Sequence, residues 1–147
     1  MKTRLVLSYE LLAQRFTLNP ASHWVGLSFD PKSELLTAVY LAKECAGDLM
    51  PWHGMVTKGP WDQSDEGEEF FLEALSVENL LDRLERFIEP EKFIFFEVPA
   101  STGMDVICKY PDQMFLSLFP ELRKTSNRDK KNAAFVLLNN MLLSRQS

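Results

Sequence analysis

Residues Lys92–Val98 read KFIFFEV, and within this stretch every residue after the lysine is apolar except Glu97. A strand with one face in water alternates apolar and polar residues, because successive side chains point to opposite faces. A strand that is apolar on both faces is typical of a position where both faces are covered. We therefore predict that residues 92–98 form a central strand with other parts of the chain packed on both of its sides.

The length and composition of the chain predict one globular domain, residues 1–147. A chain of 147 residues fits a single hydrophobic core, and 46% apolar with 25% charged residues is ordinary for such a domain. The longest apolar run, Ala133–Leu138, is far shorter than a membrane span, and the apolar positions after Met1 are too few for a signal-peptide core. We expect a cytoplasmic protein that has no membrane partner.

Two strands are predicted near the N-terminus. Leu5–Tyr9 alternates apolar and polar residues, and His23–Phe29 places Val25, Leu27 and Phe29 on one face. Between them, Leu11–Phe16 is compatible either with an extension of the first strand or with a helical turn, and the pattern does not separate the two.

Asp30 and Pro31 predict the start of a helix over about residues 31–46. Asp is a preferred N-cap residue, and Pro is suited to the first helical position. The apolar stripe has helical spacing, and Gly47 follows as a stop signal. The stripe consists of Leu35, Ala38, Val39, Ala42 and Ala46.

The rest of the chain predicts an α+β fold. Residues 49–68 are expected to form a long connection, broken at most by a short strand at 55–58. The further elements are a strand at 70–75 (with a helix as the alternative), a helix capped by Ser76, a strand at 104–110, a short helix at 111–119 and a last helix at 126–143. Their order favours a mostly antiparallel sheet with three to four helices packed on it, in a single domain.

The sequence shows no motif that predicts a catalytic residue, a metal or a cofactor. The six glycines are scattered and form no phosphate-binding motif. Four soft ligands are isolated from one another in the sequence, and Cys45 and Cys108 are expected to be buried thiols rather than a disulfide. These ligands are His23, His53, Cys45 and Cys108. Nucleic-acid binding is not expected, because the pI is near 5.1 and the basic segment 123–131 has no aromatic residue.

Residues 59–82 are the most acidic part of the chain, with eight acids and no base. Such a run either attracts a cationic partner or serves as a solvated face. One Pro-Trp pair, Pro51-Trp52, lies shortly before this stretch and a second, Pro60-Trp61, lies at its start, and tryptophan is enriched at the centres of protein interfaces. We therefore predict a partner-binding surface made of Trp52, His53, Trp61, Asp62, Asp65, Glu66, Glu68 and Glu69. The alternative is that both indoles fold back onto the core.

These features favour a non-enzymatic, acidic protein-binding module whose partner is a basic protein. Its small size and its charge match those of bacterial immunity proteins, which neutralise nuclease toxins, so that the partner could be a toxin domain. Three alternatives remain open: a small acidic chaperone or adaptor of a secreted effector, a small enzyme that uses His53 with loop carboxylates, and a homo-oligomer subunit docked through the last helix.

Overall fold

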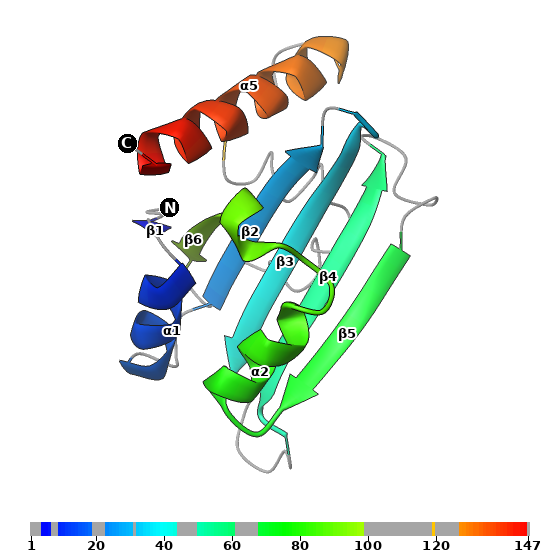
Figure 1. The fold of residues 1–147 in the computed structure, drawn as a ribbon. Coiled ribbons are helices and arrows are strands. Elements are labelled where there is room, and N and C mark those ends of the chain that lie inside the picture. Colours follow the sequence, from blue (N-terminus) through cyan, green and yellow to red (C-terminus); the bar gives the residue numbers. More distant parts are fainter. Residues whose placement is uncertain are drawn as a thin grey trace.

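Six strands form one antiparallel sheet at the centre of the molecule, as the computed structural model shows (Figure 1). The strands are β1 Arg4–Val6, β2 His23–Asp30, β3 Leu35–Lys43, β4 Trp52–Pro60, β5 Glu68–Ala74 and β6 Ile94–Val98. The helices are α1 Tyr9–Leu18, α2 Val77–Leu84, the short 3₁₀-helix η2 Pro90–Lys92 and α5 Asn127–Gln146. The structure describes residues 4–6, 9–18, 23–30, 32–43, 50–60, 68–98, 119 and 127–146.

The strands lie in the order β1-β6-β2-β3-β4-β5. Each of the five neighbouring pairs is antiparallel, so that β6 lies inside the sheet between β1 and β2. Residues 93–96 of this segment are buried. The prediction of a central strand is therefore confirmed for residues 94–98, whereas Lys92 ends η2 and the strand starts two residues later than predicted.

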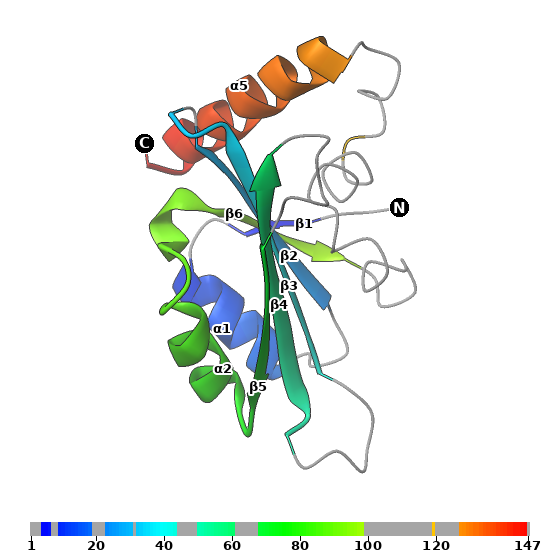
Figure 2. The ribbon, with the colours of Figure 1, turned by 90° about the vertical axis from the view of Figure 1, so that its right-hand side faces the viewer.

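The sheet separates two hydrophobic clusters. Helices α1 and α2 lie on one face, where Phe16 and Leu80 pack with Trp24 and Phe95 (Figure 2). Helix α5 lies across one end of the sheet and contacts β2 and β6. Its buried Ala134 belongs to the second cluster, together with the side chains that point to the opposite face of the sheet.

Helix α2 begins where the sequence predicts it. The Ser76 hydroxyl accepts a hydrogen bond from the Asn79 backbone N–H at 3.2 Å, which satisfies one of the free N–H groups at the helix start. The helix buries one face. The buried residues are Val77, Leu80, Leu81 and Leu84.

The predicted helix at 31–46 is wrong, because this segment contains β3. Asp30 does cap the following backbone, but within a hairpin: its Oδ1 accepts the Lys32 N–H at 3.0 Å and its Oδ2 accepts the Ser33 hydroxyl at 3.0 Å. An Asp at a turn and an Asp at a helix start accept the same kind of bond from the residue two positions on. Glu34 then turns the chain with a φ of 59°, a conformation that does not continue a helix.

The apolar stripe in this segment also has another cause. Strand β3 has a neighbour on each side and a cluster on each face, so that residues 38–42 are all buried. In a run that is apolar at nearly every position, a helical spacing can be picked out although the chain is extended. Tyr40 and the β-branched Val39 suit a strand better than a helix.

Residues 49 and 61–67 of the predicted connection at 49–68 lie outside the described residues. The prediction is wrong at residues 52–60, since these form β4, which contains and extends the short strand allowed at 55–58. Its glycines and prolines resemble loop residues, but Gly54 allows a close approach between elements. A Cβ on Gly54 would lie 3.0 Å from Leu41 Cδ2 and 3.4 Å from Leu80 Cδ1. The glycine therefore lets α2 sit close to β4.

The α+β class, the antiparallel sheet and the single domain are confirmed. Residues 11–16, which the pattern left open, belong to α1, and the predicted strand at 70–75 corresponds to β5. The predicted strand at 104–110, nearly all of the predicted helix at 111–119, Cys45 and Cys108 lie outside the described residues. No helix in the described ranges combines the length and the apolar character that crossing a bilayer needs.

Candidate functional site

Of the predicted partner-binding residues, the four that the structure describes lie in two groups on the β4–β5 hairpin. Trp52 and His53 begin β4, whereas Glu68 and Glu69 begin β5. In the antiparallel register Trp52 pairs with Ala74, and Glu68 pairs with Lys58 at the other end of the hairpin. At about 3.4 Å per residue, this separates Trp52 from Glu68 by about 20 Å along the hairpin. Trp61, Asp62, Asp65 and Glu66 lie outside the described residues.

Trp52 is half-buried and already has aromatic and cationic neighbours. Its ring meets the Phe16 ring edge-on at 4.9 Å between centroids. The Lys43 ammonium lies 5.1 Å from the Trp52 ring centroid, within the range of a cation–π contact. The indole thus closes the cluster beneath α1, and its role in partner binding stays a prediction.

His53 points to the other face of the sheet. Its Nε2–H donates to the Met50 carbonyl oxygen at 2.7 Å, since a carbonyl can only accept. Its cross-strand neighbour is Glu73, rather than the acids at the start of β5. The enzyme alternative, which combines His53 with loop carboxylates, stays a prediction, but one ring nitrogen is engaged by the backbone.

The sequence alone did not reveal a second histidine contact on this face. Nδ1 of His23 forms a hydrogen bond with the Tyr40 hydroxyl, and the two rings meet edge-on at 5.4 Å. The register places Ala42 between His23 and His53 across three strands. Only the strand pairing brings these residues together, because they belong to separate parts of the sequence.

The outer strand β5 presents an exposed aromatic ring between carboxylates. Glu69, Phe71 and Glu73 point to the same face, because they alternate along a strand. Phe71 is 67% exposed and the three acids Glu68, Glu69 and Glu73 are exposed too. We call these four residues the acidic edge. Phe71 is a surface residue that sequence reasoning missed, although its alternation with glutamates was a visible signal.

In the part of the chain that the structure describes, β5 pairs only with β4. The backbone N–H and C=O groups on the outer side of an edge strand are a template for a further strand. The acidic edge therefore combines free backbone pairing capacity, one apolar anchor and negative charge.

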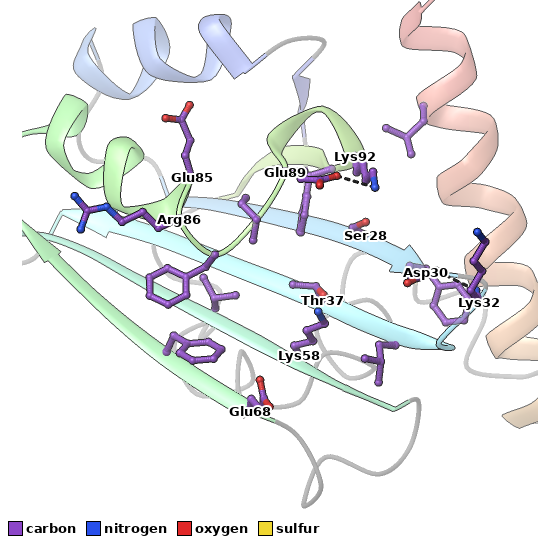
Figure 3. A pocket seen from close by; sticks show the side chains of 18 residues that line it. Ser28, Asp30, Lys32, Thr37, Lys58, Glu68, Glu85, Arg86, Glu89 and Lys92 are labelled. Atoms are coloured by element: carbon purple, nitrogen blue, oxygen red, sulfur yellow. Dashed lines mark hydrogen bonds and ion pairs between the residues drawn. The ribbon is translucent and has the colours of Figure 1, made fainter.

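A hollow of about 940 Å³ lies on the α2 face of the sheet, over the ends of β2 to β5 (Figure 3). The turn after α2 and η2 border it on one side, and the C-terminal part of α5 reaches it with Leu142. We call this hollow the groove. Both charged and aromatic side chains line the groove, so that its surface has polar and apolar parts.

Two charged side chains of the groove are held by near neighbours. The backbone N–H of Lys32, together with the Ser33 hydroxyl, lowers the pKa of Asp30 below its usual value. The Lys92 ammonium lies 2.7 Å from Glu89 Oε2, and this hydrogen bond raises the pKa of Lys92. Both groups thus stay charged at neutral pH while they are occupied by local contacts.

Within the described residues, no three His, Cys, Asp or Glu side chains gather closely enough to hold a metal ion. Comparison of the chain with protein-family models, with curated proteins and with solved structures finds no match. In the described part of the chain, the acidic edge and the groove are surfaces that a partner or a ligand could contact.

Proposed function

We propose that the protein is a non-enzymatic binding module that docks an extended, basic segment of a partner protein along the acidic edge. The observation that carries this proposal is the exposed Phe71 between Glu69 and Glu73 on an outer strand. Strand addition gives affinity through backbone hydrogen bonds, and alternate side chains give specificity.

The charge of the edge favours a cationic partner over a second copy of the chain. Two β5 strands side by side would bring glutamates against glutamates, and like charges opposite one another are destabilising. A strand that places basic residues opposite Glu69 and Glu73, with an apolar residue opposite Phe71, would be complementary. The expected pattern in the partner is therefore cation, apolar, cation at alternate positions.

A basic, nuclease-like toxin domain is the partner class that best suits this charge, which would make the protein an immunity-type inhibitor in the cytoplasm. The same edge suits the alternative role of a chaperone or adaptor for a secreted effector, because an unfolded client also has free strands. A folded partner binds with its tertiary structure intact, whereas a chaperone client binds only when unfolded, and this difference separates the two roles.

The test uses a capped synthetic peptide that alternates Lys-Thr-Val-Thr and ends in Lys. We expect the protein to bind it with an affinity that falls as salt rises, because screening weakens charge attraction between exposed groups. The combined variant Glu68→Gln, Glu69→Gln and Glu73→Gln is expected to bind at least fivefold more weakly. Replacing Phe71 by Ser is expected to weaken binding at every salt concentration. Calorimetric titration measures all of these affinities.

The matched control removes three charges from the helices instead, through Glu10→Gln, Glu78→Gln and Asp82→Asn. These carboxylates are exposed and lie outside the acidic edge. The control is expected to bind within twofold of the wild type. The proposal is overturned if the peptide does not bind, or if the edge variant and the helix control lose affinity equally.

A further inference from the structure

A row of polar side chains crosses the floor of the groove. Ser28 pairs with Thr37, Thr37 with Lys58, and Lys58 with Glu68, so that the four residues lie side by side on β2, β3, β4 and β5. All four line the groove (Figure 3). We call them the polar row. Under α2 the same face of the sheet is apolar, and the row begins where the helix no longer covers the strands.

The polar row has apolar neighbours. Val56 and Phe70 lie in the next row of the sheet, and Phe87 and Phe93 line the side formed by the turn after α2 and η2. The Phe70 and Phe87 rings are 4.9 Å apart, and Phe87 is 45% exposed. Ligand sites commonly have about 300–1,000 Å³, mostly apolar walls and a few convergent polar groups. The volume of the groove lies within this range, and its lining contains apolar side chains beside a larger number of polar and charged ones.

Among the cations that line the groove, Lys58 is the one that lies on its floor, within the polar row. Its ammonium forms no ion pair with any residue that the structure describes, whereas Lys92, at the side of the groove formed by η2, is paired with Glu89. In Figure 3 Lys58 and Thr37 lie on the sheet floor, while Glu85 points away from the strands. Glu68 occupies the outer end of the row, on the edge strand. The centre of the row therefore offers an ammonium group and two hydroxyl donors.

We propose that the groove is a second binding site, for a small amphipathic carboxylate. It shares Glu68 with the acidic edge but does not depend on docking there. The carboxylate binds Lys58 and the Thr37 hydroxyl, and the apolar body lies against Phe70, Phe87 and Phe93. A charge-assisted hydrogen bond to the ammonium is stronger than one between neutral groups, so that the anion is preferred over a neutral molecule of the same shape.

The test compares octanoate, below its micelle concentration, with 1-octanol, which has the same chain and no charge. Backbone amide shifts in ¹H–¹⁵N spectra give both the affinity and the place of binding. We expect octanoate to bind at least tenfold more tightly than octanol, with the largest shifts at Thr37, Lys58 and Phe70. Lys58→Gln is expected to abolish this preference, while Phe87→Ser weakens the binding of both molecules.

Arg83→Gln is the matched control, because Arg83 is an exposed cation on α2 that does not line the groove. It is expected to leave both affinities unchanged. Glu69→Gln with Glu73→Gln is expected to leave octanoate binding unchanged too, which separates this site from the acidic edge. The proposal is overturned if octanoate fails to bind, binds no better than octanol, or is equally affected by Lys58→Gln and Arg83→Gln.

Discussion

The hydroxyl of Tyr9 joins the first helix to the second. It donates to the Leu81 carbonyl oxygen at 3.3 Å, and the Tyr9 ring lies 5.7 Å from the Phe95 ring. Burial, followed by the carboxylates of Glu85 and Asp82, raises the pKa of Tyr9 above its usual value of 10.0. When folding raises the pKa of a phenol, its contribution to stability is complete at a pH below the pKa of the unfolded chain. The contribution is lost as the pH rises from that pKa to the higher pKa of the folded protein.

Tyr9→Phe is expected to lower the free energy of unfolding by about 1 kcal/mol at neutral pH, because it removes the hydrogen bond. Above about pH 10 the wild type loses stability as the unfolded chain releases the Tyr9 proton, and the variant has no such proton at this position. The gap between the two proteins should therefore close at alkaline pH. Urea unfolding at neutral pH and at about pH 11 measures it. A gap that stays constant would contradict this role of Tyr9.

At the scale of elements, Phe95 of β6 packs over the backbone of β2. A Cβ on Gly26 would lie 2.6 Å from Cε1 and 2.9 Å from Cδ1 of the Phe95 ring. Both residues are buried, and Phe95 also contacts the Tyr9 and Phe93 rings. The ring therefore has little freedom to move away, and the missing side chain of Gly26 leaves the space on β2 that the ring occupies.

Gly26→Ala is expected to lower the free energy of unfolding by about 1–3 kcal/mol, as overpacking of a well-filled core does. Gly54→Ala is the comparison, since its nearest contact would be 3.0 Å from Leu41 Cδ2, the end of a more flexible side chain. We expect the loss to be smaller there. Urea unfolding of both variants measures the two free energies of unfolding. Equal decreases would show that the Phe95 ring can move aside despite its contacts with Tyr9 and Phe93.

At the scale of the whole molecule, the acidic edge lies on an outer strand, which is where two copies of the chain could join. A long, exposed edge strand is a site of self-association unless charges or bulges protect it. Glu68, Glu69 and Glu73 are all exposed on β5, and no ion pair joins them to another described residue. We infer that these charges keep copies of the chain apart, in addition to the proposed role in docking a basic partner.

The combined variant Glu68→Gln, Glu69→Gln and Glu73→Gln is therefore expected to self-associate. Sedimentation at several protein concentrations should show a larger weight-average mass for this variant than for the wild type, and the difference should grow with concentration. Adding Phe71→Ser to this variant should reduce the difference in weight-average mass from the wild type. Equal masses throughout would contradict a protective role for these glutamates. If the wild type itself associates, the open alternative of docking through the last helix gains support.

Some of the fold could be predicted from the sequence because the signals are local. The Ser76 cap and the stripe of α2 depend on residues a few positions apart, and the apolar run at 92–98 predicts its own burial on both faces. These signals gave the α+β class and the central position of β6. At Asp30 the local signal led to a wrong prediction. A hydrogen bond from a backbone N–H to an Asp carboxylate is found both at the start of a helix and in a hairpin turn.

The candidate site depended on tertiary structure to a greater degree. The sequence indicates an acidic surface near residue 68, but the antiparallel pairing of β4 with β5 places Trp52 at the far end of the hairpin from Glu68. The polar row joins residues 28, 37, 58 and 68 only through three strand registers. The sequence by itself determined which residues are apolar, capped or charged, because these properties belong to short segments. Which side chains share a face was decided by strand order and register, which link distant segments.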